Sequence, residues 1–161
     1  PWRLLLSSGS PMHPAHPTAH PSIHSITFDT TGDPYYVGLF WSRLLGRPLD
    51  EDDKPGDPAA VIADPAGGPR LLFIQVPEGK TVKNRVHFDL KPNGRTRAEE
   101  VERALGLGAR LVADHTRPDG GGWVLLADPE GNEFCVERGE LGWERARWRA
   151  GASAAPRGRR S

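Results

Sequence analysis

The sequence predicts an α+β fold in which one structural unit occurs twice. A strand followed by a helix begins near Ile23, and the same order of elements restarts about 60 residues later, near Arg85. Each half reads as one strand, one helix and two or three further strands, so we expect a βαβββ unit. The two halves share this order of elements without an obvious common sequence.

The first module is expected to begin with a strand over 23–28, where β-branched and apolar residues alternate. Asp33 is a good N-cap and Pro34 suits the first position of a helix. Apolar residues at helical spacing carry this helix to Gly46, which ends it. Short strands then follow a polar loop, over 59–63 and 70–76.

The second module is expected to begin with a strand over 85–90. Thr96 is an N-cap, and Glu99 three residues later completes a capping box for a helix that ends near Leu107. The remaining expected strands cover 109–114, 122–127 and 133–138.

The last two of these strands read as a β-hairpin around a tight turn. Asp128-Pro129 ends the first arm because proline donates no hydrogen bond, and Gly131-Asn132 tolerates positive φ. The second arm alternates, with Glu133 and Cys135 on one face and apolar residues on the other. A strand with a carboxylate and a thiol on one face is suited to line a polar cavity.

Composition excludes several classes of function. The 161 residues carry a formal net charge of zero, so nothing favours nucleic acid or an anionic membrane as a partner. No apolar run approaches the roughly 20 residues that a transmembrane helix needs. One cysteine cannot form an internal disulfide, which favours a cytoplasmic location. The first residue is Pro1, so Met12 is a candidate initiator.

The folded domain is expected over 22–140, between two flanks of different composition. Residues 1–21 form a His- and Pro-rich leader that we expect to be disordered, with its histidines in solvent. Residues 141–161 form a basic tail that is also expected to be largely disordered.

Several stretches of the domain resemble the vicinal oxygen chelate superfamily, which includes glyoxalase I, bleomycin-resistance proteins and extradiol dioxygenases. They are 23–29 with 40–46, 84–90, and 123–136. The likeness extends over 23–138 and is strongest to small glyoxalase-like domain proteins. It implies two modules, about 22–77 and 84–138, that pair into a half-open barrel around a cavity.

The resemblance also implies positions for metal ligands. His24 falls on the first-strand ligand position and His87 on the corresponding position of the second module, where imidazoles suit Zn, Ni, Mn or Fe. Counting from the Asp-Pro-x-Gly turn, the last ligand position is Cys135, and Glu133 lies two residues earlier on the same face. The remaining ligand position falls on the last strand of the first module, over 71–76, where only Gln75 offers a donor, through a weak amide oxygen.

Two functions remain open at this point. One is metal-free binding of a small organic molecule in the cavity, lined by Gln75, Trp123 and Cys135, without the full metal set of glyoxalase I. The alternative is a divalent-metal-dependent lyase or dioxygenase, with His24, His87 and Glu133 as ligands and Glu133 as the candidate catalytic base. Relatives often pair, which implies a homodimer. The sequence identifies neither the ligand nor the reaction.

Overall fold

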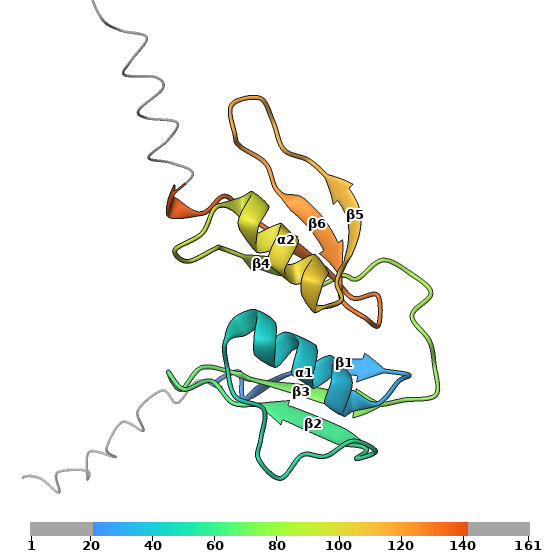
Figure 1. Cartoon of the computed structure of the whole chain (residues 1–161). Coiled ribbons are helices and arrows are strands. Elements are labelled where there is room, and N and C mark those ends of the chain that lie inside the picture. Colours follow the sequence, from blue (N-terminus) through green and yellow to red (C-terminus); the bar gives the residue numbers. More distant parts are fainter. Residues whose placement is uncertain (1–20, 142–161) are drawn as a thin grey trace, which may run out of the picture.

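The computed structural model describes residues 21–141 (Figure 1). The predicted leader and tail therefore lie almost entirely outside the described residues. The elements in chain order are β1 (Ser25–Thr30), α1 (Pro34–Leu45), β2 (Ala59–Ile62), β3 (Arg70–Gln75), β4 (Phe88–Leu90), α2 (Arg97–Leu107), β5 (Arg110–Asp114), β6 (Val124–Ala127) and β7 (Glu133–Val136).

The strands form two sheets of the same topology, which confirms the predicted α+β fold. The first sheet has the order β1-β3-β2 and the second the order β4-β7-β6-β5. In each sheet the first strand pairs in parallel with the last strand of its module. The extra edge strand of the second module corresponds in the first to a single bridge between Leu49 and Ile62. The two sheets stay open, and no closed barrel forms among the described strands.

Both helices start and end where the sequence predicts. The Asp33 carboxylate accepts a hydrogen bond from Tyr35 N at 2.9 Å, and Gly46 ends α1 with a φ of 66°. Thr96 and Glu99 form the expected capping box at the start of α2. These signals are local, so the sequence alone is sufficient to place them.

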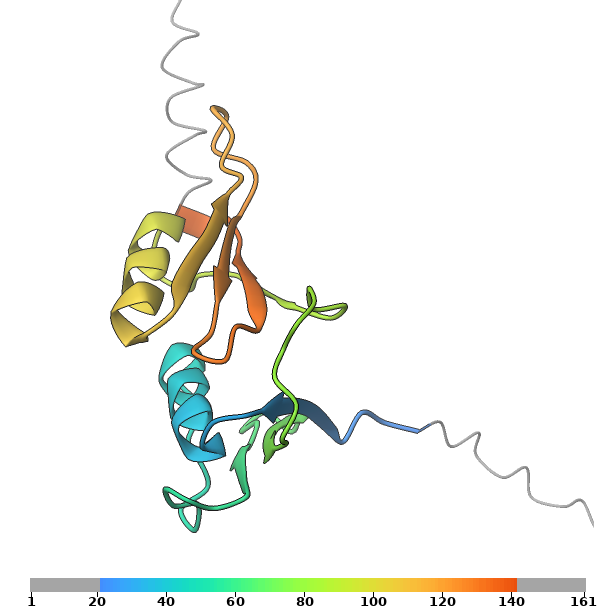
Figure 2. The same cartoon turned by 90° about the vertical axis from the view of Figure 1, so that its right-hand side faces the viewer.

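A single aromatic core joins the two modules. Trp41 on α1 is 1% exposed, and its ring centroid lies 5.7 Å from Phe28, 5.4 Å from Phe88 and 5.1 Å from Phe134. Phe28 belongs to the first module, whereas Phe88 and Phe134 belong to the second. In Figures 1 and 2 the two helices stack along one side of the molecule, while the linker over 76–87 runs along the other.

The first strand of the second module is shorter than predicted. A strand was expected over 85–90, but β4 begins only at Phe88. Residues 84–87 belong instead to the linker, in which Asn84 donates its backbone N–H to the side chain of Glu133.

The turn between β6 and β7 carries a buried carboxylate that reaches into the other module. Asp128 is 0% exposed and accepts a hydrogen bond from the Trp41 indole N–H at 2.9 Å. It also accepts from the backbone N–H groups of Glu130 and Asn132 and from the Asn132 amide. Burial raises the pKa of Asp128, and these N–H donors counteract part of that rise.

Glu130, in the same turn, bonds to the chain segment that precedes α1. Its carboxylate accepts from the backbone N–H and hydroxyl of Thr31, both at 2.9 Å, and from Gly32 N at 3.1 Å. Partial burial by itself raises the pKa of Glu130, but the hydrogen bonds outweigh it, and the net shift is downward. The ionised side chain therefore ties the second module to the first.

A third contact between the modules lies at the other end of α1. Arg103 on α2 donates to the backbone carbonyls of Arg43 at 3.0 Å and Leu44 at 2.6 Å. Its guanidinium also contacts the carboxylate of Glu100, which is itself buried. A cation thus satisfies the last carbonyls of α1, where the helix dipole favours positive charge.

The same turn sequence recurs in both hairpins, a local identity that the sequence comparison of the two halves missed. Ala63 and Ala127 each precede an Asp-Pro-x-Gly turn, at 64–67 and at 128–131. In each turn the glycine N–H donates to the aspartate carbonyl at 2.9 Å, and the glycine has positive φ. Ile62 and Leu126 each lie two residues before the aspartate of their turn. In the strand pairing, Ile62 is opposite Leu71 and Leu126 is opposite Phe134. Leu71 and Phe134 are therefore structurally equivalent.

Replacing Trp41 with Phe tests the buried contact between the modules. The Phe ring keeps most of the packing but leaves Asp128 without the indole donor in a site closed to water. We expect the free energy of unfolding to fall by about 1–3 kcal/mol in a urea titration. Trp123, which is 39% exposed, is the matched control, and Trp123→Phe should change stability by less than about 0.5 kcal/mol. Equal losses in the two variants would contradict this role of Trp41.

Replacing Glu130 with Gln tests the second contact through its pH dependence. The pKa of Glu130 is lowered by folding from its ordinary value of 4.5, so the ionised form stabilises the folded state fully above that pH. The contribution is lost as the pH falls through the lowered pKa. We expect the wild type to exceed Glu130→Gln in free energy of unfolding at about pH 7, and the difference to shrink below about pH 4.5. Urea titrations across this range measure it, and a difference that grows on acidification would refute the assignment.

Candidate functional site

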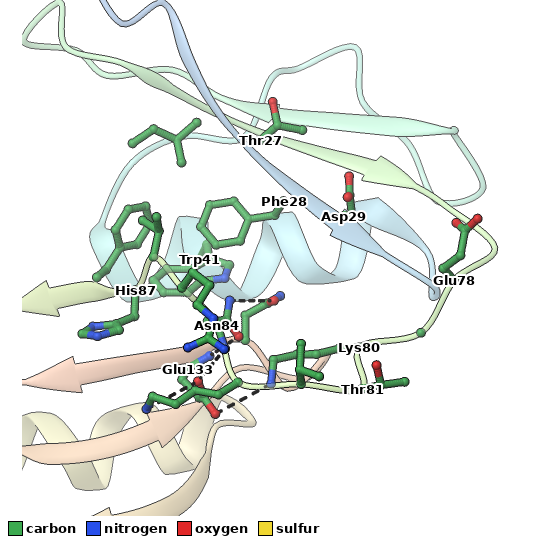
Figure 3. A pocket seen from close by; sticks show the side chains of 18 residues that line it. Thr27, Phe28, Asp29, Trp41, Glu78, Lys80, Thr81, Asn84, His87 and Glu133 are labelled. Atoms are coloured by element: carbon green, nitrogen blue, oxygen red, sulfur yellow. Dashed lines mark hydrogen bonds and ion pairs between the residues drawn. The ribbon is translucent and has the colours of Figure 1, made fainter.

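A cavity of about 500 Å³ lies between the two modules (Figure 3). This volume falls in the range typical of sites for small organic molecules. The residues that line it come from β1 (Ile26–Asp29), Trp41, the linker and the start of β4 (78–88), Asn132 and Glu133. The linker supplies the largest share of this wall.

The floor of the cavity is aromatic. The half-buried rings of Phe28 and Phe88 lie edge to face with centroids 5.4 Å apart, and Trp41 lies against both. Figure 3 shows Phe28 and Trp41 on one side of the space, with Lys80, Asn84 and Glu133 facing them. Such a floor offers flat apolar area to a ligand.

The linker is held over the cavity by Glu133. The carboxylate of this residue accepts from Asn84 N at 3.0 Å and lies 3.7 Å from Lys80 Nζ and 3.9 Å from Lys83 Nζ. The side chain of Glu133 is only 14% exposed. The side-chain amide of Asn84 also donates to the Asn132 side chain at 3.4 Å. Lys80 and Asn84 therefore fix both ends of the segment 80–84 to the start of β7. In this conformation Glu133 positions the linker and is not free for a metal.

The two predicted histidine ligands do not occupy equivalent positions. Ile26 faces Leu71, and Phe88 faces the equivalent residue of the second module, so Ile26 and Phe88 correspond. The residue before Phe88 is His87, whereas the residue before Ile26 is Ser25. His24 is therefore displaced by one residue, and the expected symmetry of the pair is wrong.

His24 also has a different partner from the one expected of a ligand. It lies exposed just before β1, and its Nε2 atom accepts from Arg70 Nη2 at 2.6 Å. It is not among the residues that line the cavity, whereas His87 and Glu133 are. The described structure does not gather His24, His87 and Glu133 into one group of potential ligands.

A different group of metal-ligand type exists among the described residues: His87, Asp89 and Cys135, whose donor atoms lie within 4.8 Å of one another. His87 Nδ1 is 3.4 Å from Asp89 Oδ1. Burial, reinforced by the nearby carboxylates of Asp89 and Glu137, raises the pKa of the Cys135 thiol to about 11. Without an ion beside it, the thiol is therefore protonated and unreactive at neutral pH.

The three side chains expected to line the cavity lie elsewhere. Gln75 donates its amide to the Gly32 carbonyl at 3.4 Å. The Trp123 ring packs against His115 in the connection between β5 and β6, with centroids 5.1 Å apart. Cys135 is 5% exposed, on the second sheet. Sequence reasoning missed the linker as part of the cavity lining. Its clustered basic residues Lys80, Lys83 and Arg85 were the available sign of a binding surface.

A family model described as the glyoxalase-like domain matches residues 25–137, well over half of the chain. The chain belongs to this family. None of the helices in the described residues is long and apolar enough to cross a membrane. A search among curated proteins found no significant match.

Solved structures share the fold of this glyoxalase-like domain. Hypothetical protein SA1046 from S. aureus matches with a TM-score of 0.56 and 18% identity, covering 74% of this chain and 95% of that one. A glyoxalase/bleomycin resistance protein/dioxygenase family enzyme from Burkholderia phytofirmans PsJN matches with a TM-score of 0.54 and 18% identity, covering 72% and 97%. Fosfomycin resistance protein FosX from Mesorhizobium loti matches with a TM-score of 0.55 and 15% identity, covering 80% and 99%.

Removing the Glu133 carboxylate tests how the linker is held. In Glu133→Ala, Asn84 N–H loses its acceptor and the two lysines lose their counter-charge. We expect the Asn84 amide to exchange with deuterium at least about tenfold faster, since hydrogen bonds to charged groups contribute about 1.5–3 kcal/mol.

The matched control is Glu137→Ala, two residues beyond Cys135 and without a contact to the linker among the described residues. It should leave the exchange rate of Asn84 unchanged. Faster exchange in both variants would mean that the whole β7 segment loosens, and Glu133 would then have no special part in holding the linker.

Proposed function

We propose that this glyoxalase-like domain binds a small organic molecule in the cavity between its two modules. The observation that carries the proposal is the aromatic floor of Phe28, Trp41 and Phe88 beneath a linker that Glu133 holds in place. A ready-made space of about 500 Å³ needs little reorganisation before a ligand enters.

The lining favours a ligand with a planar apolar part and polar groups at its edge. Phe28 and Phe88 provide surfaces on which a ring can pack, and Asn84, Arg85 and His87 provide polar atoms along the linker. Arg85 is exposed, and its side chain makes no ion pair with another described residue, so its charge is available to an anionic group.

Metal-dependent lyase or dioxygenase chemistry on His24, His87 and Glu133 has less support. His24 is bonded to Arg70 outside the cavity, and Glu133 is committed to Asn84 and the linker lysines. Binding through the aromatic floor needs no rearrangement of either side chain, which is why we place it first.

Filling the cavity tests the proposal without removing any core contact. Thr27 is an exposed residue on β1 that lines the space, and Thr27→Trp puts an indole into it. Ligands are first found by ligand-observed NMR with a panel of small aromatic acids and amides. We expect Thr27→Trp to weaken every cavity ligand by at least about tenfold in isothermal titration, about 1.4 kcal/mol.

Val112→Trp is the matched control, because Val112 is half-exposed on β5 and lies outside the cavity lining. It should leave the affinity within about twofold of the wild type. A ligand that binds Thr27→Trp as tightly as the wild type would place the binding site elsewhere on the molecule.

A further inference from the structure

We propose that the segment 143–148 of this chain docks into an apolar groove beside α2. The groove lies within the second module and shares no lining residue with the cavity between the modules. The proposal therefore stands independently of the proposed cavity ligand.

The groove has a volume of about 590 Å³ and runs between α2 and the strands β5 and β6. Its apolar walls are Ala98, Val101 and Leu105 on α2, with Leu111 and Val124 on the strands. Leu105 is 41% exposed and Leu111 is 57% exposed. Large aliphatic side chains that face water on both walls of one groove are stabilised when another apolar group covers them.

The charged residues around this groove suit an indole that has basic neighbours. Arg97 donates to the Gly120 carbonyl at 2.8 Å, and the Arg138 guanidinium lies against the same glycine. Guanidinium groups attract the face of an indole. Glu102 and Asp114 add two exposed carboxylates to the lining, and Glu102 makes no ion pair with another described residue.

The segment 143–148 carries the complementary side chains. Its sequence is Trp-Glu-Arg-Ala-Arg-Trp, so two indoles flank a short charged stretch. Tryptophan buries a large apolar area for few rotatable bonds, which suits it to cover the aliphatic walls. Arg145 and Arg147 supply positive charge for the two carboxylates of the lining.

The described chain ends close to this groove. Arg138 lines it, and Gly139 passes so near the loop before α2 that a Cβ there would lie 2.7 Å from the Arg95 carbonyl oxygen. Leu141 ends the described chain beside the first turn of α2 (Figures 1 and 2). The stretch from Leu141 to Trp148 spans up to about 24 Å when extended, whereas α2 is about 16 Å long. Both indoles are therefore within reach of the groove.

Limited proteolysis of the full chain tests the docking. A protease specific for arginine cleaves after Arg145 and Arg147 only when the segment has left the groove, and cleavage after Arg157 is the internal reference. Leu111→Gln replaces an apolar wall residue with a polar one of similar size. We expect this variant to be cleaved after Arg145 and Arg147 at least about fivefold faster than the wild type, with cleavage after Arg157 unchanged.

Val112→Gln is the matched control, because Val112 is 50% exposed on the same strand and does not line the groove. It should leave the three cleavage rates within about twofold of the wild type. Leu111 and Val112 are both exposed, so neither replacement removes a core contact, and circular dichroism confirms the fold of each variant.

Methyl NMR of the full chain observes the same contact from the side of the groove. The double variant Trp143→Ser, Trp148→Ser removes both indoles of the segment. We expect the methyl resonances of Leu105 and Leu111 to move, because they lose the ring current of an adjacent indole. Trp2→Ser, which removes a tryptophan from the opposite flank of the sequence, should leave these resonances in place.

Three results would overturn the proposal. Equal cleavage rates after Arg145 in the wild type and Leu111→Gln would show that the segment does not occupy the groove. Equal acceleration by Leu111→Gln and Val112→Gln would show that the replacements only loosen β5. Protection that is lost when the protein is diluted would assign the groove to a second copy of the chain, because docking within one chain does not depend on concentration.

Discussion

The hydrogen bond from the Trp41 indole to the buried Asp128 carboxylate is the contact on which the arrangement of the two modules depends. Asp128 is 0% exposed, so each of its hydrogen bonds has to come from the protein. Trp41 supplies one from the first module, and the turn 128–132 supplies the others. The indole of Trp41 is the donor that comes from the first module, so this hydrogen bond sets the orientation of α1 against the hairpin of β6 and β7. Because Trp41 also lies under the cavity, this contact fixes the position of the aromatic floor.

The two Asp-Pro-x-Gly turns show how one local structure acquired two roles. Asp64 and Asp128 organise the same turn with the same backbone hydrogen bond at 2.9 Å. The Asp64 carboxylate lies 3.4 Å from Arg47 within its own module, whereas the Asp128 carboxylate bonds across to Trp41. Both modules thus have the same turn, and the partner of the aspartate carboxylate decides whether the turn joins the two modules. The sequence shows the turn motif but not the partner of either aspartate.

The same distinction explains which features the sequence could predict. Helix caps such as Asp33 and Thr96, and the face alternation of β7, depend on residues a few positions apart, and the structure confirms them. The hydrogen bond between Asn84 and Glu133 joins residues 49 positions apart, and no local sequence pattern predicts it. The equivalence of His24 and His87 failed for a related reason. A strand start is uncertain by a residue in sequence, and a shift of one residue moves every side chain to the opposite face.

Glu133 illustrates why a ligand pattern cannot be carried from one member of a fold to another without the geometry. On the sequence it is a carboxylate at a promising place on the last strand. In the folded chain its charge is compensated by Lys80 and Lys83, and its oxygen accepts from the linker backbone. A carboxylate so engaged would have to release the linker to bind an ion, and the cavity would lose the wall that the linker forms. Holding the cavity and holding a metal are therefore competing demands on this side chain.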